Sequence, residues 1–305
     1  MSLPPMDTAE QASAFFDELE RASAVARYRL TGSYDEAQWG RAAYSAAPIP
    51  QLPKSVNGLP STVIIHYTAS PTLQSTVAWF CKASLNSQRA AHIAVAQDLD
   101  KVFKPEELRV YPTIAQLPAL PVICRSPKKP AVHATWANGI SVGIELVNLG
   151  TDVVSAFGKT RDLAQASGRT WEKYPSPQIE TAAFLVRALR LMCPAIGLDA
   201  VLGHEHVQGA QTPNVLEDKR DPGPMFPWPA FRDACRIARD AKESDDRPTY
   251  IADLEELGYY MRGPTHPSIK IFQYMMGLSV DGVAGPKTQA AIQKRLVDRG
   301  LRGIA

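Results

Sequence analysis

The sequence predicts an α/β protein with a mixed central β-sheet flanked by helices, followed by a small C-terminal three-helix domain. Four short apolar segments have the character of strands, and segments with helical periodicity lie between them, which is typical of an α/β layer. The chain has 305 residues, of which 45% are hydrophobic and 21% are charged, as in ordinary globular proteins. A polar, charged stretch at 242–248 predicts a domain boundary before the last helical segments.

The first 60 residues are expected to form a helical and extended N-terminal segment. Within 8–28, apolar residues such as Phe15 and Leu19 recur at helical spacing behind Thr8, a candidate N-cap. The following stretch, AAPIPQLPKSVNGLPS, is rich in proline and small residues, and we expect it to be an extended linker or loop. Residues 1–60 are therefore assigned to this segment.

The next 180 or so residues are expected to form the α/β domain, residues 61–240. The predicted strands are STVIIHY, AHIAVAQ, VGIELVN and AVLGHEHV. The predicted helices are STVAWFCKASL and SPQIETAAFLVRALRLMCP, and the second has Ser176 as N-cap and Pro177 at its first position. Residues 105–140 contain six prolines and are predicted to be a long irregular excursion of the kind that often lines a functional site.

Three short helical segments follow a linker at 241–249 and predict a helical domain over 250–305. They are TYIADLEELGYYM, HPSIKIFQYMMG and GPKTQAAIQKRLVDRG, and the turn LSVDGVAG separates the last two. Asp281 and Gly282 suit a tight turn, and Gly285 followed by Pro286 suits the start of the last helix.

Bulk properties argue against several functional classes. A net charge of +2 is too close to neutral to indicate nucleic acid or an anionic membrane as the main partner. No apolar run reaches the roughly 18 residues of a membrane-spanning helix. The N-terminus lacks the basic start and apolar core of a secretory signal, so we expect synthesis in the cytoplasm without a signal peptide. The four cysteines form no CxxC pair and predict neither a zinc finger nor a disulfide scaffold. We also expect the protein to be a monomer.

Two of the six histidines stand at the ends of predicted strands. His66 ends the apolar run TVIIH, and His204 follows VLG. Side chains at the carboxyl ends of strands in open α/β sheets face the crevice where ligands bind. A catalytic zinc ion takes three protein ligands from His, Asp, Glu or Cys and keeps one position open. Spacing alone leaves the third ligand undecided among Glu205, Glu217, Asp218, Asp221 and, if the strand continues, His206.

Several motifs together resemble a known enzyme family. The segments TVIIHYTAS, RAAHIAVAQD, SVGIELVN and VLGHEHVQG, followed by DKRDPGPMFPW, are similar to the successive motifs of the type 2 N-acetylmuramoyl-L-alanine amidases, a family that includes the animal peptidoglycan recognition proteins. The resemblance covers about 61–235, and DPGPMFPW with an upstream GH is its most specific part. The chain departs from the family pattern where AAH replaces SAH, and where an insertion lengthens the segment between the GH histidine and the aspartate.

The resemblance implies a zinc site made by His66, His204 and Asp221. Asp221 is preferred to Asp218 because it keeps the PGP context that follows the aspartate in the family. His206 is not expected to be a ligand, because in the family the chain leaves the strand just after the GH histidine. The implied reaction is hydrolysis of the amide between N-acetylmuramic acid and L-alanine of bacterial peptidoglycan.

The resemblance also implies catalytic and substrate-binding roles. Glu145 matches the catalytic glutamate, which moves a proton from water to the leaving amine, and Lys219 matches a lysine that stabilises the oxyanion. Without the resemblance, Glu145 in its apolar strand could equally be a buried salt-bridge partner. Lys219 would then be interpreted as a charged residue on a solvated loop. The candidate substrate contacts are His92, His133, Tyr67 and Trp136.

The C-terminal segment resembles the common peptidoglycan-binding domain. The matching residues include Phe272 and Gln273, then Asp281 and Gly282 in the turn, across 250–298. The resemblance implies a module that raises the local concentration of the enzyme on the cell wall, in the periplasm or outside the cell. The alternative is a helical cap that packs on the catalytic domain. A phage endolysin or an exported lytic effector fits this organisation, and a non-catalytic peptidoglycan-binding protein is the alternative function.

Overall fold

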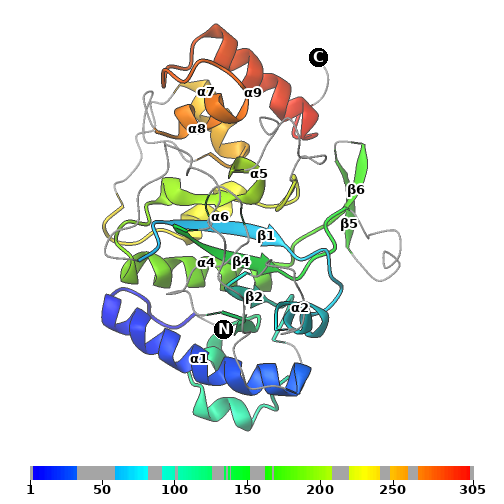
Figure 1. The fold of residues 1–305 in the computed structure, drawn as a ribbon, viewed down its shortest axis with the longest axis vertical. Helices are drawn as coiled ribbons and strands as arrows, with labels where there is room; N and C mark the ends of the chain where they lie inside the picture. Colours follow the sequence, from blue (N-terminus) through cyan, green and yellow to red (C-terminus); the bar gives the residue numbers. More distant parts are fainter. Residues whose placement is uncertain are drawn as a thin grey trace.

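The structure is a computed structural model of the 305-residue chain. The residues it describes are 3–32, 59–81, 91–99, 102–125, 134, 137, 139–151, 162–166, 168–207, 220–240, 248–259 and 267–302. The predicted fold class is confirmed, because a mixed sheet lies between helices on both faces, and three C-terminal helices form one of these layers (Figure 1).

A five-stranded sheet with the order β3-β2-β4-β1-β7 forms the centre of the molecule. Strands β2, β4, β1 and β7 are parallel, and β3 pairs antiparallel with β2 at the edge. The strands are β1 (Thr62–Tyr67), β2 (Ile93–Val95), β3 (Pro121–Ile123), β4 (Ser141–Leu146) and β7 (Val201–Gly203). A separate antiparallel ribbon consists of β5 (Leu163–Ala166) and β6 (Arg169–Glu172).

One face of the sheet is covered by α1, α2 and α4. These helices are α1 (Ala9–Thr31), α2 (Leu73–Phe80) and α4 (Ser176–Met192). Ile65 of β1 and Ile144 of β4 belong to the same buried cluster as Phe15 of α1 and Phe184 of α4. Because side chains alternate along a strand, every second residue of β1 and β4 points into this core.

The opposite face is covered by the C-terminal helices, which lie above the sheet in Figure 1. Ile64 of β1 and Leu202 of β7 share a second buried cluster with Leu254, Phe272 and Ile292. The other helical elements among the described residues are α5 (His204–Val207), α6 (Trp228–Ala234), α7 (Thr249–Glu256), α8 (Pro267–Met275), α9 (Pro286–Asp298) and the short 3-10 turns at Glu107–Val110, Ile114–Gln116 and Leu198–Ala200. The C-terminal helices are therefore part of the packing of the sheet.

The long helix α1 closes the outer edge of the sheet. Thr8 and Gln11 form a capping box at its start, as the sequence indicates for Thr8. On its buried side, the Ser23 hydroxyl accepts a hydrogen bond from the Ile123 backbone N–H at 2.8 Å, and Arg27 donates one to the Ile123 carbonyl. The carboxylate of Glu18 accepts hydrogen bonds from two further backbone N–H groups of the excursion. Side chains of α1 thus satisfy backbone groups that no strand pairs.

The structure departs from the sequence predictions in two strands. β3 lies inside the excursion that was predicted to be irregular, and its Pro121 is tolerated because it is the first residue of an edge strand. The predicted strand over 200–207 ends at Gly203, and the chain turns into the one-turn helix α5 at His204. The predicted linker at 241–249 lies mostly outside the described residues.

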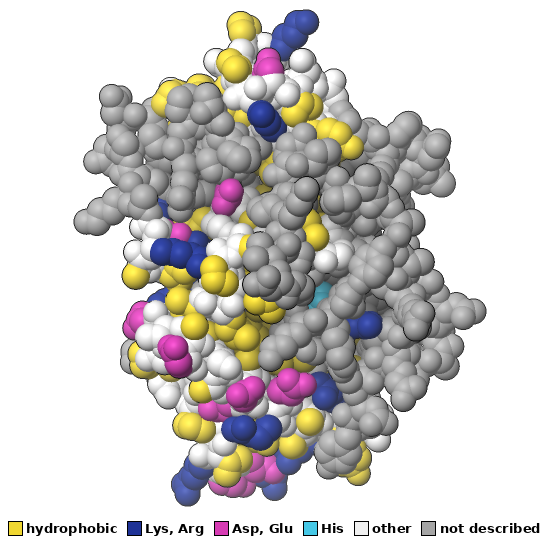
Figure 2. Space-filling model, turned by 60° about the vertical axis from the view of Figure 1, so that its left-hand side comes forward, with side chains coloured by type: hydrophobic (Ala, Val, Ile, Leu, Met, Phe, Trp, Pro, Cys, Tyr) yellow, Lys and Arg dark blue, Asp and Glu magenta, His cyan; other side chains and the backbone are white. Residues whose placement is uncertain are grey.

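The described residues also bear on the surface and on the cysteines. All four cysteines are free thiols, and Cys193 is buried at the end of α4. No described helix has both the length and the apolar character that crossing a membrane requires. Basic and acidic side chains are interspersed over the described part of the face in Figure 2. This distribution agrees with the small net charge of the chain.

Candidate metal centre

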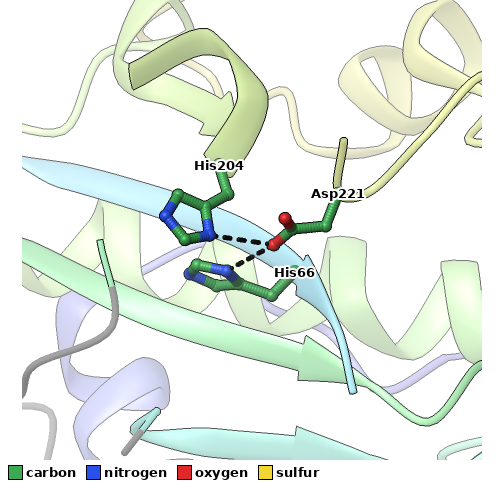
Figure 3. A group of neighbouring side chains, drawn as sticks. All are labelled: His66, His204 and Asp221. Carbon is green, nitrogen blue, oxygen red and sulfur yellow. Dashed lines mark hydrogen bonds and ion pairs between the residues drawn. The ribbon is translucent and has the colours of Figure 1, made fainter. Parts of the chain in front are cut away.

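Two neighbouring parallel strands bring His66 and His204 together. Ile65 of β1 is opposite Gly203 of β7, so the residues that follow them lie side by side at the carboxyl ends of the strands. His66 shares its face of β1 with Ile64, the face that the C-terminal helices cover. The turn into α5 directly after Gly203 directs the His204 side chain toward His66 (Figure 3).

Asp221 reaches the same place from the chain segment that precedes α6. Its backbone carbonyl accepts a hydrogen bond from the Glu205 N–H at 3.0 Å, which ties the segment to α5. The Tyr174 hydroxyl donates to the Pro222 carbonyl at 2.6 Å. A Cβ atom on Gly203 would lie 2.5 Å from Pro222 Cδ, so only glycine allows so close an approach. These contacts hold the Asp221 carboxylate between the two imidazoles.

The three side chains converge on one oxygen atom. Asp221 Oδ2 lies 2.8 Å from His66 Nδ1 and 3.0 Å from His204 Nδ1, and the two ring centroids are 4.5 Å apart (Figure 3). One potential ligand atom from each residue lies within 4.8 Å of the others. The three residues are only 2%, 5% and 7% exposed, so the site is shielded by protein.

The electrostatics of the group favour an ionised carboxylate. Burial raises the pKa of Asp221, but the attraction of His204 and hydrogen bonds from both histidines outweigh burial and hold the pKa well below its usual range. A carboxylate and two imidazole nitrogens are a ligand set that zinc takes in catalytic sites, with one position left for water. The geometry and donor chemistry of these residues therefore fit a zinc ion.

Glu145 lies on the strand next to His66. The register of the parallel pair β1–β4 places its Cα opposite that of His66, so both side chains leave the sheet on the same face. The residue is half-buried, whereas its neighbours Ile144 and Leu146 on the other face are fully buried. A carboxylate at this position is therefore a direct neighbour of His66.

Two other predicted site residues have defined surroundings. His92 is fully buried, and its Nδ1 accepts a hydrogen bond from the Gly143 N–H at 2.9 Å, which joins the segment before β2 to β4. Tyr67 follows His66 but points to the opposite side of the strand, where its half-buried ring packs at Gly150 and near Trp171. Substrate binding by either residue stays a prediction. The other candidates lie outside the described residues: Lys219, His133 and Trp136.

His206, which spacing alone left as a possible ligand, makes other contacts. Its Nδ1 accepts a hydrogen bond from the Gly203 N–H at 2.8 Å, and its Nε2 is 2.8 Å from the Leu257 carbonyl. Burial lowers its pKa to about 3, so the ring is neutral and its Nε2–H donates to that carbonyl. Both ring nitrogens are used in joining β7, α5 and the C-terminal helices.

Sequence reasoning missed two contacts that support the candidate ligands. Tyr174 holds the backbone next to Asp221, and Glu205, which spacing alone left as a possible zinc ligand, pairs instead with Arg299 beyond α9. The sequence offers no periodic pattern for either contact, since the pair is separated by 94 residues. The one available signal is the position of Glu205 directly after His204.

Comparison with known proteins supplies the family. A sequence profile described as N-acetylmuramoyl-L-alanine amidase matches residues 57–224 of this chain, which is more than half of it. None of the curated protein sequences compared with the chain matches it.

Two solved structures are similar to this chain over most of its length. One is the N-acetylmuramyl-L-alanine amidase AmiD from E. coli, in complex with anhydro-N-acetylmuramic acid-L-Ala-D-γ-Glu-L-Lys. It has 20% identity and a TM-score of 0.43, with 86% of this chain and 94% of that chain covered. The other is AmpDH3 from Pseudomonas aeruginosa, at 19% identity and a TM-score of 0.44, with 83% and 95% covered.

The profile match includes β1, β4, β7 and the three converging side chains, so it contains the whole candidate metal centre. The chain belongs to the N-acetylmuramoyl-L-alanine amidase family, and it is an amide hydrolase of this class.

Proposed function

We propose that this protein is a zinc hydrolase that cuts the amide between the lactyl group of N-acetylmuramic acid and L-alanine in bacterial peptidoglycan. The observation that carries the proposal is the convergence of His66 Nδ1 and His204 Nδ1 on Asp221 Oδ2. These three residues would hold the zinc ion. When bound, zinc lowers the pKa of its water toward about 7 and polarises the scissile carbonyl.

The protein contributes a proton carrier and a shielded site. The Glu145 carboxylate would accept a proton from the attacking water and deliver it to the amine of L-alanine as the C–N bond breaks. Its place opposite His66 in the β1–β4 register supports this role. Lys219 would stabilise the oxyanion, on the strength of its position in the family motif.

We further propose that the C-terminal helices bind peptidoglycan. The similarity of 250–298 to the common peptidoglycan-binding domain supports this role, as does a turn built around Gln273. The Gln273 side chain donates to Asp281 Oδ1 at 2.7 Å and accepts from the Gly282 N–H at 2.8 Å. Val283, which is 56% exposed, stands in this turn. The site of action would be the cell wall.

Digestion of purified sacculi tests the reaction. The zinc-loaded protein is incubated with sacculi, and the soluble products are identified by mass spectrometry. Free stem peptides that begin with L-alanine are expected. Products cut at a peptide crosslink would contradict the proposed bond specificity, and intact muropeptides with tight sacculus binding would indicate a recognition protein.

An Asp221→Ala variant tests the ligand set. Because zinc loses one of three protein ligands, we expect the variant to lose both bound zinc and activity while it still sediments with sacculi. Zinc is measured by elemental analysis after desalting. Asp233→Ala is the matched control, because this carboxylate is 76% exposed on α6 and forms a local ion pair with Arg236. Normal zinc content in Asp221→Ala would exclude Asp221 as a ligand.

A further inference from the structure

The C-terminal helices contact α5, which carries one of the three candidate ligands, His204. The four residues of α5 are all buried, and each of the last three is engaged by or packed with the C-terminal helices. Glu205 pairs with Arg299, His206 donates to the Leu257 carbonyl, and Val207 shares the core of the C-terminal helices. Only the His204 side chain turns away, toward Asp221.

Glu205 links the C-terminal helices to two of the proposed ligands, His204 and Asp221. It follows His204 directly in the chain, and its backbone N–H donates to the Asp221 carbonyl at 3.0 Å. Its carboxylate is held by Arg299 Nη1, and both side chains of this pair are almost fully buried. A shift of Glu205 therefore moves the backbone of His204 and removes a hydrogen bond from that of Asp221.

We propose that Arg299 is a positioning residue for the metal site and that it acts through Glu205. The C-terminal module then has a second task besides binding the wall, since it holds His204 and Asp221 in the geometry that the ion requires. The proposal rests on the zinc site put forward above. Arg299 is not itself a ligand of the metal, and its effect is transmitted by the α5 backbone.

The energetic cost of losing the pair is concentrated at α5. A buried carboxylate without its partner is strongly unfavourable. Without Arg299, the turn that carries Glu205 would therefore move toward water, or the carboxylate would take up a proton. Burial also lowers the pKa of Arg299 to about 10, which leaves the guanidinium charged at neutral pH. Mutation of groups that orient metal ligands commonly weakens metal binding by roughly 10- to 100-fold.

The test measures zinc affinity and ligand geometry in the full-length protein. Zinc dissociation constants come from competition with a chromophoric chelator, and the visible spectrum of the cobalt-substituted protein reports the coordination geometry. We expect Arg299→Gln and Glu205→Gln each to weaken zinc binding by about tenfold and to alter the cobalt spectrum. Because both substitutions remove the same contact, the double variant should bind zinc no more weakly than either single variant does. Arg299→Lys, which keeps the charge, should recover part of the affinity.

Arg302→Gln is the matched control. Arg302 also pairs with a buried carboxylate, Asp253 at 2.5 Å, but this pair lies within the C-terminal helices and does not reach α5. The control should lower thermal stability and leave the zinc affinity and the cobalt spectrum unchanged. Equal loss of affinity in Arg302→Gln would mean that general destabilisation is the cause, and this would overturn the proposal.

Different results would contradict the zinc site and the positioning role of Arg299. If the wild-type protein binds no zinc, the proposed function is wrong. If the wild type binds zinc and both Arg299→Gln and Glu205→Gln keep its affinity, only the positioning role is wrong. Where Arg299→Gln reduces the folded fraction, Glu205→Gln gives the same comparison, because it keeps the shape of the side chain and its backbone N–H.

Discussion

Glu145 and the three ligand candidates are expected to make separable contributions to the reaction. A Glu145→Gln variant keeps the three proposed zinc ligands and removes the proposed proton acceptor. We expect normal zinc content together with a loss in kcat of roughly 10²- to 10⁴-fold. The measurement is turnover of a muramyl peptide, with zinc assayed in the same preparation. Full activity in this variant would assign the proton transfer to another group.

The absence of a side chain at Gly203 allows the segment of Asp221 to approach β7 closely. A methyl group there would come within 2.5 Å of Pro222 Cδ and 3.3 Å of the Asp221 carbonyl oxygen. We therefore expect Gly203→Ala to displace Asp221 and to weaken zinc binding by about tenfold. Gly285→Ala serves as the control, because nothing lies within 4 Å of a Cβ atom at Gly285. Unchanged zinc affinity in Gly203→Ala would mean that the segment moves aside without disturbing the ligand.

The sequence predicted the residues of the centre unevenly. His66 and His204 could be found from residue chemistry, because each stands at the end of an apolar strand. Asp221 could be chosen only through its family motif, since the chain between His204 and Asp221 contains other carboxylates at comparable spacing. The pair of Glu205 and Arg299 depends on tertiary packing alone, and residue spacing holds no signal of it.

Among the elements, α1 makes a contribution that a single substitution can measure. Phe15 is 2% exposed, and its ring packs edge-on against Phe184 of α4 with centroids 5.0 Å apart. We expect Phe15→Ala to lower the free energy of unfolding by about 3–5 kcal/mol, because it leaves a cavity between α1 and α4. Urea denaturation in the presence of zinc measures the change. Ser13→Ala, on the exposed side of the same helix, should change it by about 0.5 kcal/mol or less.

The elements that the sequence predicted well have strong local signals. The helix over 8–28 has its cap and apolar stripe, and the strand over 61–67 is a compact apolar run. β3 has three residues and begins with Pro121, so neither length nor composition distinguishes it from a loop. β7 ends at Gly203, where α5 begins and contacts the C-terminal helices, whereas the local sequence is compatible with a longer strand.

At the scale of the whole molecule, zinc should couple to stability. Because the three candidate ligands come from β1, α5 and a later segment before α6, the proposed site exists only in the folded chain. Zinc at 100 times its dissociation constant should add about 2.7 kcal/mol to the free energy of unfolding. Calorimetry with and without a chelator measures the difference. Asp221→Ala should show no zinc-dependent shift, and a shift in that variant would place the ion elsewhere.

The arrangement of the C-terminal helices was the least predictable part of the molecule. Their apolar positions predicted three helices, and the structure contains α7, α8 and α9. A helical cap on the catalytic domain was one of two alternatives for them, but the sequence did not indicate that their core would include Ile64 and Leu202 from the sheet. An apolar helix face specifies burial but does not specify its partner, so this packing required the three-dimensional structure.

The bonds between α1 and β3 also concern how copies of this protein behave toward one another. An open sheet border offers unsatisfied amide and carbonyl groups to any extended peptide, and this is a common starting point for fibrous aggregates. Ser23 and Arg27 occupy these groups at Ile123. The N-terminal helix consequently leaves these backbone groups at Ile123 unavailable to a strand from a second molecule.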